Sequence, residues 1–265
     1  MPAEPVDPIR IRAVTSAGVR LVLAECPPRT LGIAARPNAA NTGGPKITGA
    51  EALTVARASV ALDGPMFSDT GQAFSRFRFR LLDRGAGLDV PSRDPRAGYT
   101  LSVVGNVASV AEGSTVAEGA SFAVQCYPTL AKDGERAALA DTESNNSRVW
   151  RAAVALMPTG LVALVVGVAT LRAFAAALAG LGVRWAGYTD GGSSTELRSR
   201  LGPRWGYPGA PRVPAWVVAR GPLEDTTRSS SSTGGGSSGA LVALLALGGL
   251  AAWWWTARDA APPVV

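Results

Sequence analysis

The chain has 265 residues, 47% of them apolar and 17% charged, so disorder along its whole length is excluded and one domain with an appendage is expected. No histidine occurs, which excludes Ser-His-Asp and Cys-His catalytic systems and every zinc site that contains histidine. The formal net charge is +6, but the arginines are scattered and form no nucleic-acid motif, so we expect no nucleic-acid partner.

The first half of the chain has short apolar runs separated by glycine and proline clusters, a pattern typical of strands joined by turns. We predict one helix, at residues 49–57. The strands are predicted at residues 19–24, 31–35, 59–62, 77–82, 99–104 and 122–125. The N-terminus has prolines and acids where a cleavable export signal needs a basic start and an apolar run, so no such signal is expected.

Phenylalanines and arginines alternate between residues 74 and 80. The phenylalanines are Phe74, Phe77 and Phe79, and the arginines are Arg76, Arg78 and Arg80. This pattern predicts a strand with one wet face, and a groove for an anionic ligand is the alternative.

The second half of the chain continues with strands predicted at residues 150–156, 161–166, 184–188 and 213–218. The apolar stretch 161–183 has the length of a membrane span, but Arg172 lies in its middle. We therefore predict a buried strand and then a helix at 171–181, with Thr170 as its N-cap and Gly182 at its end. Together these elements predict an α+β domain, mostly antiparallel sheet with a few packed helices.

The C-terminal part differs in composition from the domain. Residues 229–239 form a serine- and glycine-rich spacer that offers nothing to bury. Residues 240–255 carry no charge and end in three tryptophans, which predicts a short transmembrane helix in contact with membrane lipid. The predicted divisions are N-terminal strands or an extension at 1–44, a domain at 45–222, a linker at 223–239, a single-pass membrane segment at 240–255 and a tail at 256–265.

The two cysteines, Cys26 and Cys126, have no CxxC spacing, so a thiolate metal site or a redox motif is not supported. We expect two free, buried thiols, with a disulfide as the alternative. The acidic and amide residues between 141 and 146 offer oxygen ligands for a hard cation, but they lack the EF-hand spacing. A polar loop is expected there, and neither a metal nor a cofactor is expected.

The most distinctive motif is RWAGYTDGGSSTEL at residues 184–197, directly after the predicted helix. A strand leads into Asp190, and the residues after it are Gly191, Gly192, Ser193 and Ser194. Such a corner places a carboxylate beside a tight glycine turn, with backbone N–H groups and hydroxyls able to point at one oxygen-rich ligand. The alternative is an ordinary hairpin turn, which D-G-G also makes.

The elements around this motif resemble the phosphodiester glycosidase family. That family has a Gly-x-Thr-Leu helix and then a strand ending in L-D-G-G-G-S-S, and this chain reads GVATLRAFAAALAGLGVRWAGYTDGGSSTEL. Four more segments resemble family motifs in the same order: VALDGPMFS at 60–68, QCYPTLAKDG at 125–134, RAAVALMPTGLVALVVG at 151–167 and PRVPAWVVA at 211–219. The resemblance covers about residues 45–220.

The chain also departs from the family pattern. A family asparagine is Asp63 here, and a glycine close to it is Pro65. The Gly-Gly pair before a proline is Cys126 and Tyr127, the threonine after the arginine is Ala152, and one glycine of the L-D-G-G-G-S-S turn is missing. These changes bear on whether the family activity is retained.

The resemblance implies a hydrolase, free of cofactors, that cleaves the glycosidic bond of a sugar-1-phosphodiester or related glycan. Together with the predicted membrane segment, this leads us to expect a membrane-anchored enzyme of cell-surface polysaccharide metabolism. The phosphomonoester that leaves is weakly basic and needs little protonation, which suits a site without histidine. The resemblance implies Asp190 and Asp63 as paired catalytic carboxylates and Arg151 as a bidentate grip on the phosphate. The substrate-binding residues that it implies are Gly191, Gly192, Ser193, Ser194 and Gln125.

Each of these roles has a plainer alternative. Arg151 is otherwise an exposed charge on a strand, and Asp63 in LDGP otherwise starts a turn. Glu196 is a spare carboxylate that could replace Asp63, but its place after the turn predicts solvent exposure. The rival function is a membrane-tethered protein of the same fold that binds carbohydrate or phosphate, or has a structural role, without catalysis.

The side of the membrane on which the domain lies has two conflicting indications. Arg220 and Arg228 precede the apolar segment and Arg258 follows it, so the positive-inside bias places the domain in the cytoplasm. The resemblance to the family implies a domain outside the cytoplasm.

Overall fold

The computed structural model describes residues 7–35, 46–64, 77–80, 87–90, 98–209 and 211–228, which belong to the unit Met1–Arg228. Its largest element is an eight-stranded sheet, called the main sheet below. The strands of the main sheet are β1 (Ile9–Ser16), β2 (Val19–Cys26), β11 (Thr129–Lys132), β12 (Glu135–Arg136), β13 (Val149–Leu156), β14 (Val162–Ala169), β15 (Trp185–Gly191) and β20 (Leu223–Asp225). Their order is β12-β11-β15-β13-β14-β2-β1-β20, and only the β1–β20 pair is parallel.

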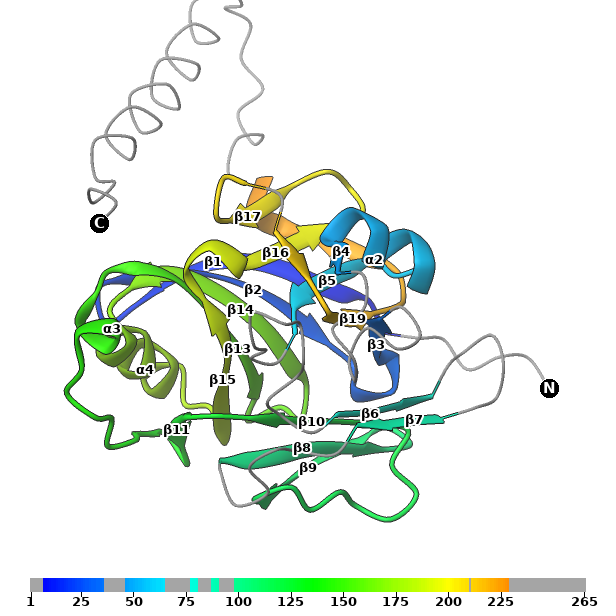
Figure 1. Ribbon diagram of the computed structural model, residues 1–265, viewed down its shortest axis with the longest axis horizontal. Coiled ribbons are helices and arrows are strands. Elements are labelled where there is room, and N and C mark those ends of the chain that lie inside the picture. The colour runs from blue at the N-terminus through cyan, green and yellow to red at the C-terminus, as the bar shows by residue number, and fades with distance from the viewer. Residues whose placement is uncertain are drawn as a thin grey trace, which may run out of the picture. The chain divides into compact units, whose positions relative to one another are not determined.

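Two five-stranded antiparallel sheets share a hydrophobic core with the main sheet (Figure 1). The second sheet consists of β3 (Leu31–Ala35), β5 (Val60–Asp63), β16 (Glu196–Ser199), β17 (Arg204–Gly206) and β19 (Ala215–Ala219). The third sheet consists of β6 (Phe77–Arg80), β7 (Gly87–Val90), β8 (Tyr99–Val104), β9 (Val107–Glu112) and β10 (Phe122–Cys126). Their orders are β17-β16-β5-β19-β3 and β7-β6-β10-β8-β9, and β4 (Ile47–Thr48) pairs separately with β18 (Arg212–Val213). The predicted α+β class, with mostly antiparallel sheet, is confirmed.

Strand β14 is buried on both of its faces. Leu164 and Val166 contribute to the core shared by the three sheets, whereas Ala163 and Val165 contribute to a second core on the opposite face. The sequence of a strand that is covered on both sides is a continuous apolar run, because no side chain of the strand faces water. The apolar stretch 161–183, which has the length of a membrane span, therefore begins with a central strand of the sheet and continues as a helix.

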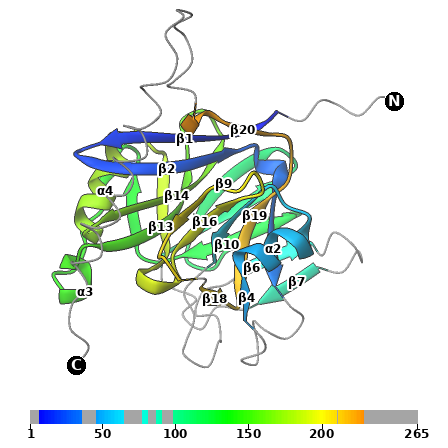
Figure 2. The same cartoon turned by 90° about the horizontal axis from the view of Figure 1, so that it is seen from above.

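Helix α4 (Leu171–Gly180) covers the second core, and it lies along one side of the main sheet (Figures 1 and 2). The Thr170 hydroxyl caps its N-terminus, and Gly182 follows its end with φ +68. Gly167 of β14 allows the close packing, because an added Cβ would lie 2.8 Å from Leu21 and 3.5 Å from Phe174 of the helix. The strand and helix predicted between residues 161 and 183 are both confirmed.

Helix α2 (Gly49–Ala56) packs on the outer face of the second sheet. Thr48 and Glu51 form a capping box, with the Glu51 carboxylate 2.8 Å from the Thr48 N–H. Trp216 of β19 is fully buried beneath the helix, and its indole N–H donates to the Ile47 carbonyl at 2.9 Å. This contact ties the centre of the second sheet to the entry of the helix. The helix predicted at residues 49–57 is confirmed.

The two ends of the described unit differ most from the sequence prediction. Strand β1 was not predicted, although Ile9 and Ile11 are fully buried and Arg10 between them is exposed. Strands β2 and β3 pair with β14 and β19, so they are built into the sheets although they come from the predicted extension 1–44. Strand β20 pairs with β1 although it comes from the predicted linker 223–239.

Other predictions have mixed outcomes. A strand at residues 77–80 is confirmed, but Phe74, Arg76 and the two faces of that strand lie outside the described residues. Cys26 and Cys126 are free and buried, as expected, and burial raises the pKa of both thiols. Residues 240–255 lie outside the described part, and within that part no helix combines the length and the apolar character needed to cross a membrane.

Phe174 tests the packing of α4 on the main sheet. We expect Phe174→Ala to lower the free energy of unfolding by about 3–5 kcal/mol, because the side chain is fully buried and leaves a cavity. Val55, which is 52% exposed on α2, provides the control, and Val55→Ala should change the free energy by less than about 0.5 kcal/mol. Urea denaturation of the full chain measures both, and equal effects would contradict the packing.

Candidate active site

Asp63 lies at the end of β5, between the neighbouring strands β16 and β19. Its side chain is fully buried, its Oδ1 accepts the Glu196 N–H at 3.0 Å, and its Oδ2 is buried without a partner among the described residues. The next residue in the chain is a glycine, Gly64, because the Ala215 carbonyl leaves no room for a Cβ at that position. Asp63 is therefore a carboxylate held inside the molecule and not an exposed start of a turn.

Asp190 lies on β15 next to an irregularity of the main sheet. Opposite β13, Gly191 pairs with Arg151 and Tyr188 pairs with Ala153, so β15 has one extra residue between these pairs. Such a bulge changes the direction in which a side chain points, and bulges are frequent beside active sites. The Asp190 Oδ1 accepts the Gly191 N–H at 2.7 Å.

The glycines of the D-G-G-S-S motif have separate structural reasons. Gly191 has no room for a side chain because the Tyr188 hydroxyl occupies the position of a Cβ. Gly192 has φ +70, a left-handed conformation that favours glycine, and begins a short turn of 3-10 helix, η2 (Gly192–Ser194). The Ser194 hydroxyl donates to the Gly191 carbonyl at 3.0 Å, whereas Ser193 is exposed. The corner is thus more constrained than an ordinary hairpin turn.

Arg151 is 3% exposed, so it is not the exposed strand charge of the plainer alternative. Its Nη1 donates to the Tyr188 hydroxyl at 3.0 Å, and its Nη2 donates to the carbonyls of Ser144 and Ser147 at 2.6 and 3.0 Å. Its Nε donates to the Ala169 carbonyl at 3.5 Å. Of its five N–H groups, one on Nη1 has no partner among the described residues, so a bidentate grip on phosphate would require these contacts to break.

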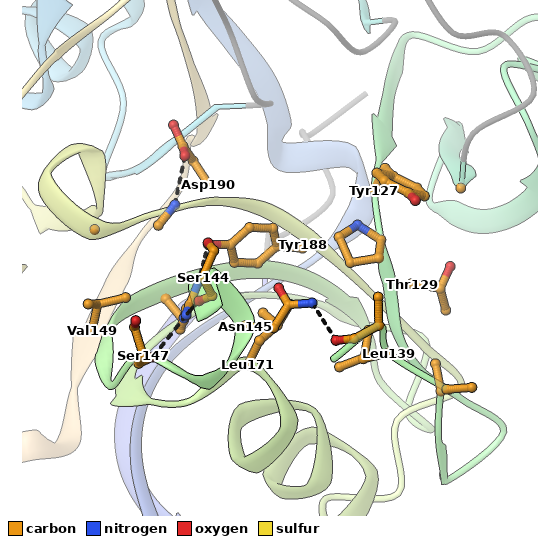
Figure 3. Close-up of a pocket in the computed structure, with 18 residues that line it drawn as sticks. Tyr127, Thr129, Leu139, Ser144, Asn145, Ser147, Val149, Leu171, Tyr188 and Asp190 are labelled. Carbon is orange, nitrogen blue, oxygen red and sulfur yellow. Dashed lines mark hydrogen bonds between the residues drawn. The ribbon is translucent and has the colours of Figure 1, made fainter. Parts of the chain in front are cut away.

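A pocket of ≈ 810 Å³ opens between Arg151 and Asp190 (Figure 3). Its lining includes Tyr188, Gly191 and Gly192 beside these two residues. The remaining lining residues are uncharged: Gly98, Tyr127, Pro128, Thr129, Ala137, Ala138, Leu139, Ala140, Ser144, Asn145, Ser147, Val149 and Leu171. A concave, mostly apolar site with a few polar groups at one end is the usual form of a small-molecule site.

The predicted site residues are brought together in part. Asp190, Arg151, Gly191 and Gly192 line the pocket, whereas Ser193 and Ser194 belong to the adjoining turn. Gln125 is buried in β10 and is not among the residues that line the pocket. Within the described residues, no three His, Cys, Asp or Glu side chains are grouped for a metal ion.

The acidic segment around residues 141–146 is exposed and polar. Helix α3 (Glu143–Asn146) forms its centre, with Thr142 as N-cap. The Asp141 carboxylate accepts from the Asn146 amide at 2.7 Å and lies 3.5 Å from the Arg172 guanidinium. Its side chains therefore satisfy one another, and the carbonyl of Ser144 faces Arg151.

Asp63 and Asp190 influence each other electrostatically. Burial raises the pKa of Asp63 well above its ordinary value, and the charge of Asp190 raises it further. Burial also raises the pKa of Asp190, but the Gly191 N–H and the Ser194 side chain lower it. Burial raises the pKa of Tyr188 to about 12, against the opposing effect of Arg151. The pair therefore holds its proton on Asp63 more readily than on Asp190.

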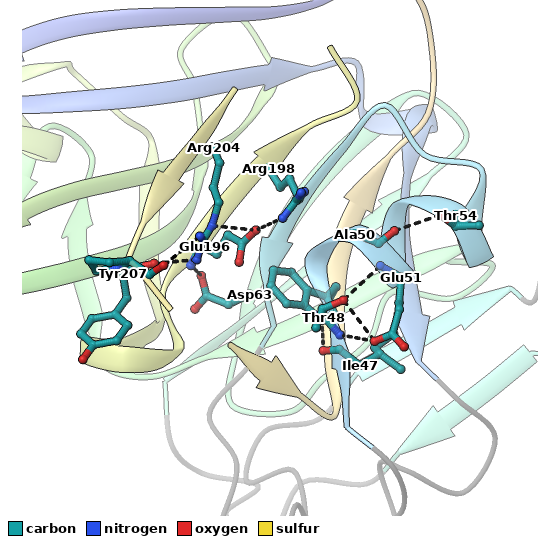
Figure 4. Close-up of polar contacts among 12 residues, drawn as sticks. Ile47, Thr48, Ala50, Glu51, Thr54, Asp63, Glu196, Arg198, Arg204 and Tyr207 are labelled. Atoms are coloured by element: carbon teal, nitrogen blue, oxygen red, sulfur yellow. Dashed lines mark hydrogen bonds and ion pairs between the residues drawn. The ribbon is translucent and has the colours of Figure 1, made fainter. Parts of the chain in front are cut away.

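Glu196 differs from its sequence prediction. It is fully buried, so the expected solvent exposure is wrong. The reason is that Glu196 begins β16, which is enclosed between β5 and β17. Its Oε1 lies 3.2 Å from Arg198 Nη1 and 3.2 Å from Arg204 Nε (Figure 4). This cluster was missed because nothing in the local sequence shows that two arginines will flank the glutamate.

The fold and the site define an α+β protein in which the half-buried Asp190 lines a pocket and interacts electrostatically with the fully buried Asp63. The phosphodiester glycosidase (NAGPA) family model matches residues 58–218, and the chain belongs to that family. No curated protein matches the chain.

Two solved structures share the fold. The zebrafish N-acetylglucosamine-1-phosphodiester alpha-N-acetylglucosaminidase catalytic domain, auto-inhibited by its pro-peptide, is 17% identical, with a TM-score of 0.59, and the match covers 83% of this chain and 85% of that one. A hypothetical protein from Synechocystis is 16% identical, with a TM-score of 0.52, and the match covers 78% of this chain and 61% of that one.

The burial of Asp63 predicts a pH-dependent effect on stability. A raised pKa in the folded state means that the contribution of Asp63 to stability is present at low pH and is lost as the pH rises through the folded-state pKa. We expect Asp63→Asn to raise the free energy of unfolding at pH 7 by about 1–3 kcal/mol, because the folded chain no longer has to keep a buried carboxyl protonated that would ionise in the unfolded chain. The gain should shrink as the pH falls toward the ordinary carboxyl value of 3.8.

Denaturation of the full chain at several pH values measures this difference. Glu143, an exposed carboxylate on α3, provides the control, and Glu143→Gln should show no comparable dependence on pH. A gain for Asp63→Asn that stays constant from pH 4 to pH 7 would contradict a raised pKa.

Proposed function

We propose that this protein is a hydrolase that cleaves the glycosidic bond of a sugar-1-phosphodiester. Family membership supports the reaction class, and one observation carries the proposal for this chain: Asp190 lines the pocket, and its charge acts on the fully buried Asp63. Carboxylates with strongly raised pKa values in a concave site are typical of acid–base chemistry.

The two carboxylates have different roles in this proposal. Asp190 lines the pocket, accepts the Gly191 N–H and is the more acidic member, so it acts as the anion that is nucleophile or general base toward the sugar. Asp63 holds the proton and keeps the pair singly charged. This matters because a phosphodiester is itself an anion, and a second negative charge would repel it.

The reaction balances without a cofactor. The oxygen of water becomes bonded to the sugar C1, and the bond between C1 and the phosphate oxygen breaks. The electron pair of that bond leaves with the phosphomonoester, and the proton lost by water passes to a carboxylate and then to solvent. A phosphomonoester has a second pKa of about 6, so it leaves without strong protonation.

Arg151 has a structural and an electrostatic role in this proposal. Its contacts to Ser144 and Ser147 hold the segment that forms one wall of the pocket. Arg151 also lines the pocket, where its positive charge favours binding of an anionic group. The phosphate is thus attracted by Arg151 while the guanidinium keeps its internal contacts.

Hydrolysis of an N-acetylglucosamine-1-phosphodiester by the full chain tests the proposal directly. We expect free sugar and a phosphomonoester, and we expect Asp190→Asn to lower kcat by about 10²–10⁴-fold because the anion is lost. The control is Glu135→Gln, which changes an exposed carboxylate on β12. Undiminished turnover by Asp190→Asn would remove Asp190 from the mechanism.

The alternative function is a binding protein of the same fold without catalysis. The observation that favours it is the engagement of the Arg151 guanidinium by three backbone carbonyls and a tyrosine hydroxyl. The same assay separates the two functions, since a binding protein would retain the phosphodiester and release no sugar. Calorimetric titration with the uncleaved substrate measures that binding.

We also propose that residues 240–255 anchor the protein in a membrane, in line with their uncharged, tryptophan-ended sequence. The full chain should sediment with membranes and resist extraction by high salt, whereas a chain without 240–255 should stay in the supernatant. Deleting the spacer 229–239 is the control and should leave the protein with the membranes. Equal distribution of the two deletion variants would contradict the anchor, and protease protection in intact cells reports the side on which the domain lies.

A further inference from the structure

Glu196 is a fully buried charge for which the proposed reaction has so far no role. Arg198 and Arg204 both approach its Oε1 at 3.2 Å, and its Oε2 is buried without a partner among the described residues. Burying a carboxylate with only one of its oxygens engaged is unfavourable, and replacing such a group with an apolar residue is often neutral or stabilising. A buried glutamate held in this way therefore points to a role beyond stability.

Glu196 is linked to Asp63 by a hydrogen bond and by the pairing of their two strands. The Glu196 backbone N–H donates to Asp63 Oδ1 at 3.0 Å, and the next residue, Leu197, pairs with Leu62 of β5. Asp63 and Glu196 therefore lie side by side on adjacent strands (Figure 4). Each presents one carboxylate oxygen that is buried and unpartnered within the described residues.

We propose that Glu196, held by Arg198 and Arg204, is a positioning residue that keeps the proton of the carboxylate pair on Asp63. This inference rests on the proposed hydrolase function. The Glu196 N–H orients Asp63, and the Glu196 charge opposes a second negative charge beside it. The two arginines hold the Glu196 carboxylate in place beside Asp63, so that the proton resides on Asp63 and Asp190 stays the anion at the pocket.

The charged and titratable groups around Asp63 come from three strands. Strand β15 contributes Asp190 and Tyr188, and strand β16 contributes Glu196. The arginines of β16 and β17 act through Glu196. From β19, the residue paired with Asp63 is the uncharged Trp216. Removing a negative charge or a positive charge from this set should therefore shift the titration of Asp63 in opposite directions.

The test compares Glu196→Gln with Arg204→Gln in the full chain. If Asp63 must be protonated, kcat/KM falls as the pH rises through its pKa. We expect Glu196→Gln to move this alkaline limb to lower pH by about one unit and Arg204→Gln to move it to higher pH by a similar amount. Arg204→Lys keeps the charge and should leave the limb in place, and Glu25→Gln is the control for loss of a paired carboxylate elsewhere.

A second readout makes the result independent of turnover. The carboxyl carbon of Asp63, followed by NMR across the pH range, should titrate with the same opposite shifts in the two variants. A purely structural role of Glu196 predicts that the variants lose kcat or stability while the alkaline limb of kcat/KM and the titration of the Asp63 carboxyl group stay where they are. That result would overturn the inference. If the wild-type chain hydrolyses no phosphodiester, the proposed function fails, while the Asp63 titration still decides the electrostatic role of Glu196.

Discussion

The structure depends on keeping two carboxylates close together and away from water. Asp63 and Asp190 come from different sheets, and Asp63 is fully buried whereas Asp190 is half-buried. Burial and like charge both disfavour ionisation of the pair, so the rest of the fold has to offset the cost of enclosing these groups. The extensive core shared by the three sheets provides that stabilisation through apolar burial.

Arg151 shows how the same fold shapes the pocket. Its guanidinium connects β13 to the carbonyls of Ser144 and Ser147 in the α3 segment and to the Tyr188 hydroxyl on β15. Carbonyl oxygens satisfy its donors without neutralising its charge. The wall of the pocket is thereby fixed while a net positive potential remains beside Asp190. One buried side chain thus determines both the shape and the charge of the site.

The sequence predicted the parts of the structure that depend on local pattern. Helix α4 was predicted from its period and its Thr170 cap, and the position of Asp190 at a glycine corner was predicted from D-G-G-S-S. The grouping of Asp63 and Arg151 with Asp190 came from the order of motifs and not from spacing. Strand β1 was missed because its arginines and threonine weaken the apolar signal of Ile9 and Ile11.

What was not predictable depends on contacts between distant segments. The burial of Glu196 follows from the pairing of β16 with both β5 and β17, and the local residues alone indicate an exposed turn. The bulge before Gly191 appears only when β15 is set against β13. The hydrogen-bond partners of Arg151 are mostly backbone carbonyls, which every residue has and which therefore cannot be recognised from the residue types. A sequence therefore identifies candidate acids more readily than the surroundings that set their pKa values.

The absence of histidine explains why those surroundings matter so much in this protein. No side chain of the chain has an ordinary pKa near neutrality, and a carboxyl group holds a proton at physiological pH only where its pKa is raised. Burial does this for Asp63, and the neighbouring negative charges add to it. The Gly191 N–H and the Ser194 side chain act in the opposite direction on Asp190. In the proposed mechanism, the difference between the two environments, more than the identity of the residues, decides which carboxylate holds the proton and which one faces the pocket as an anion.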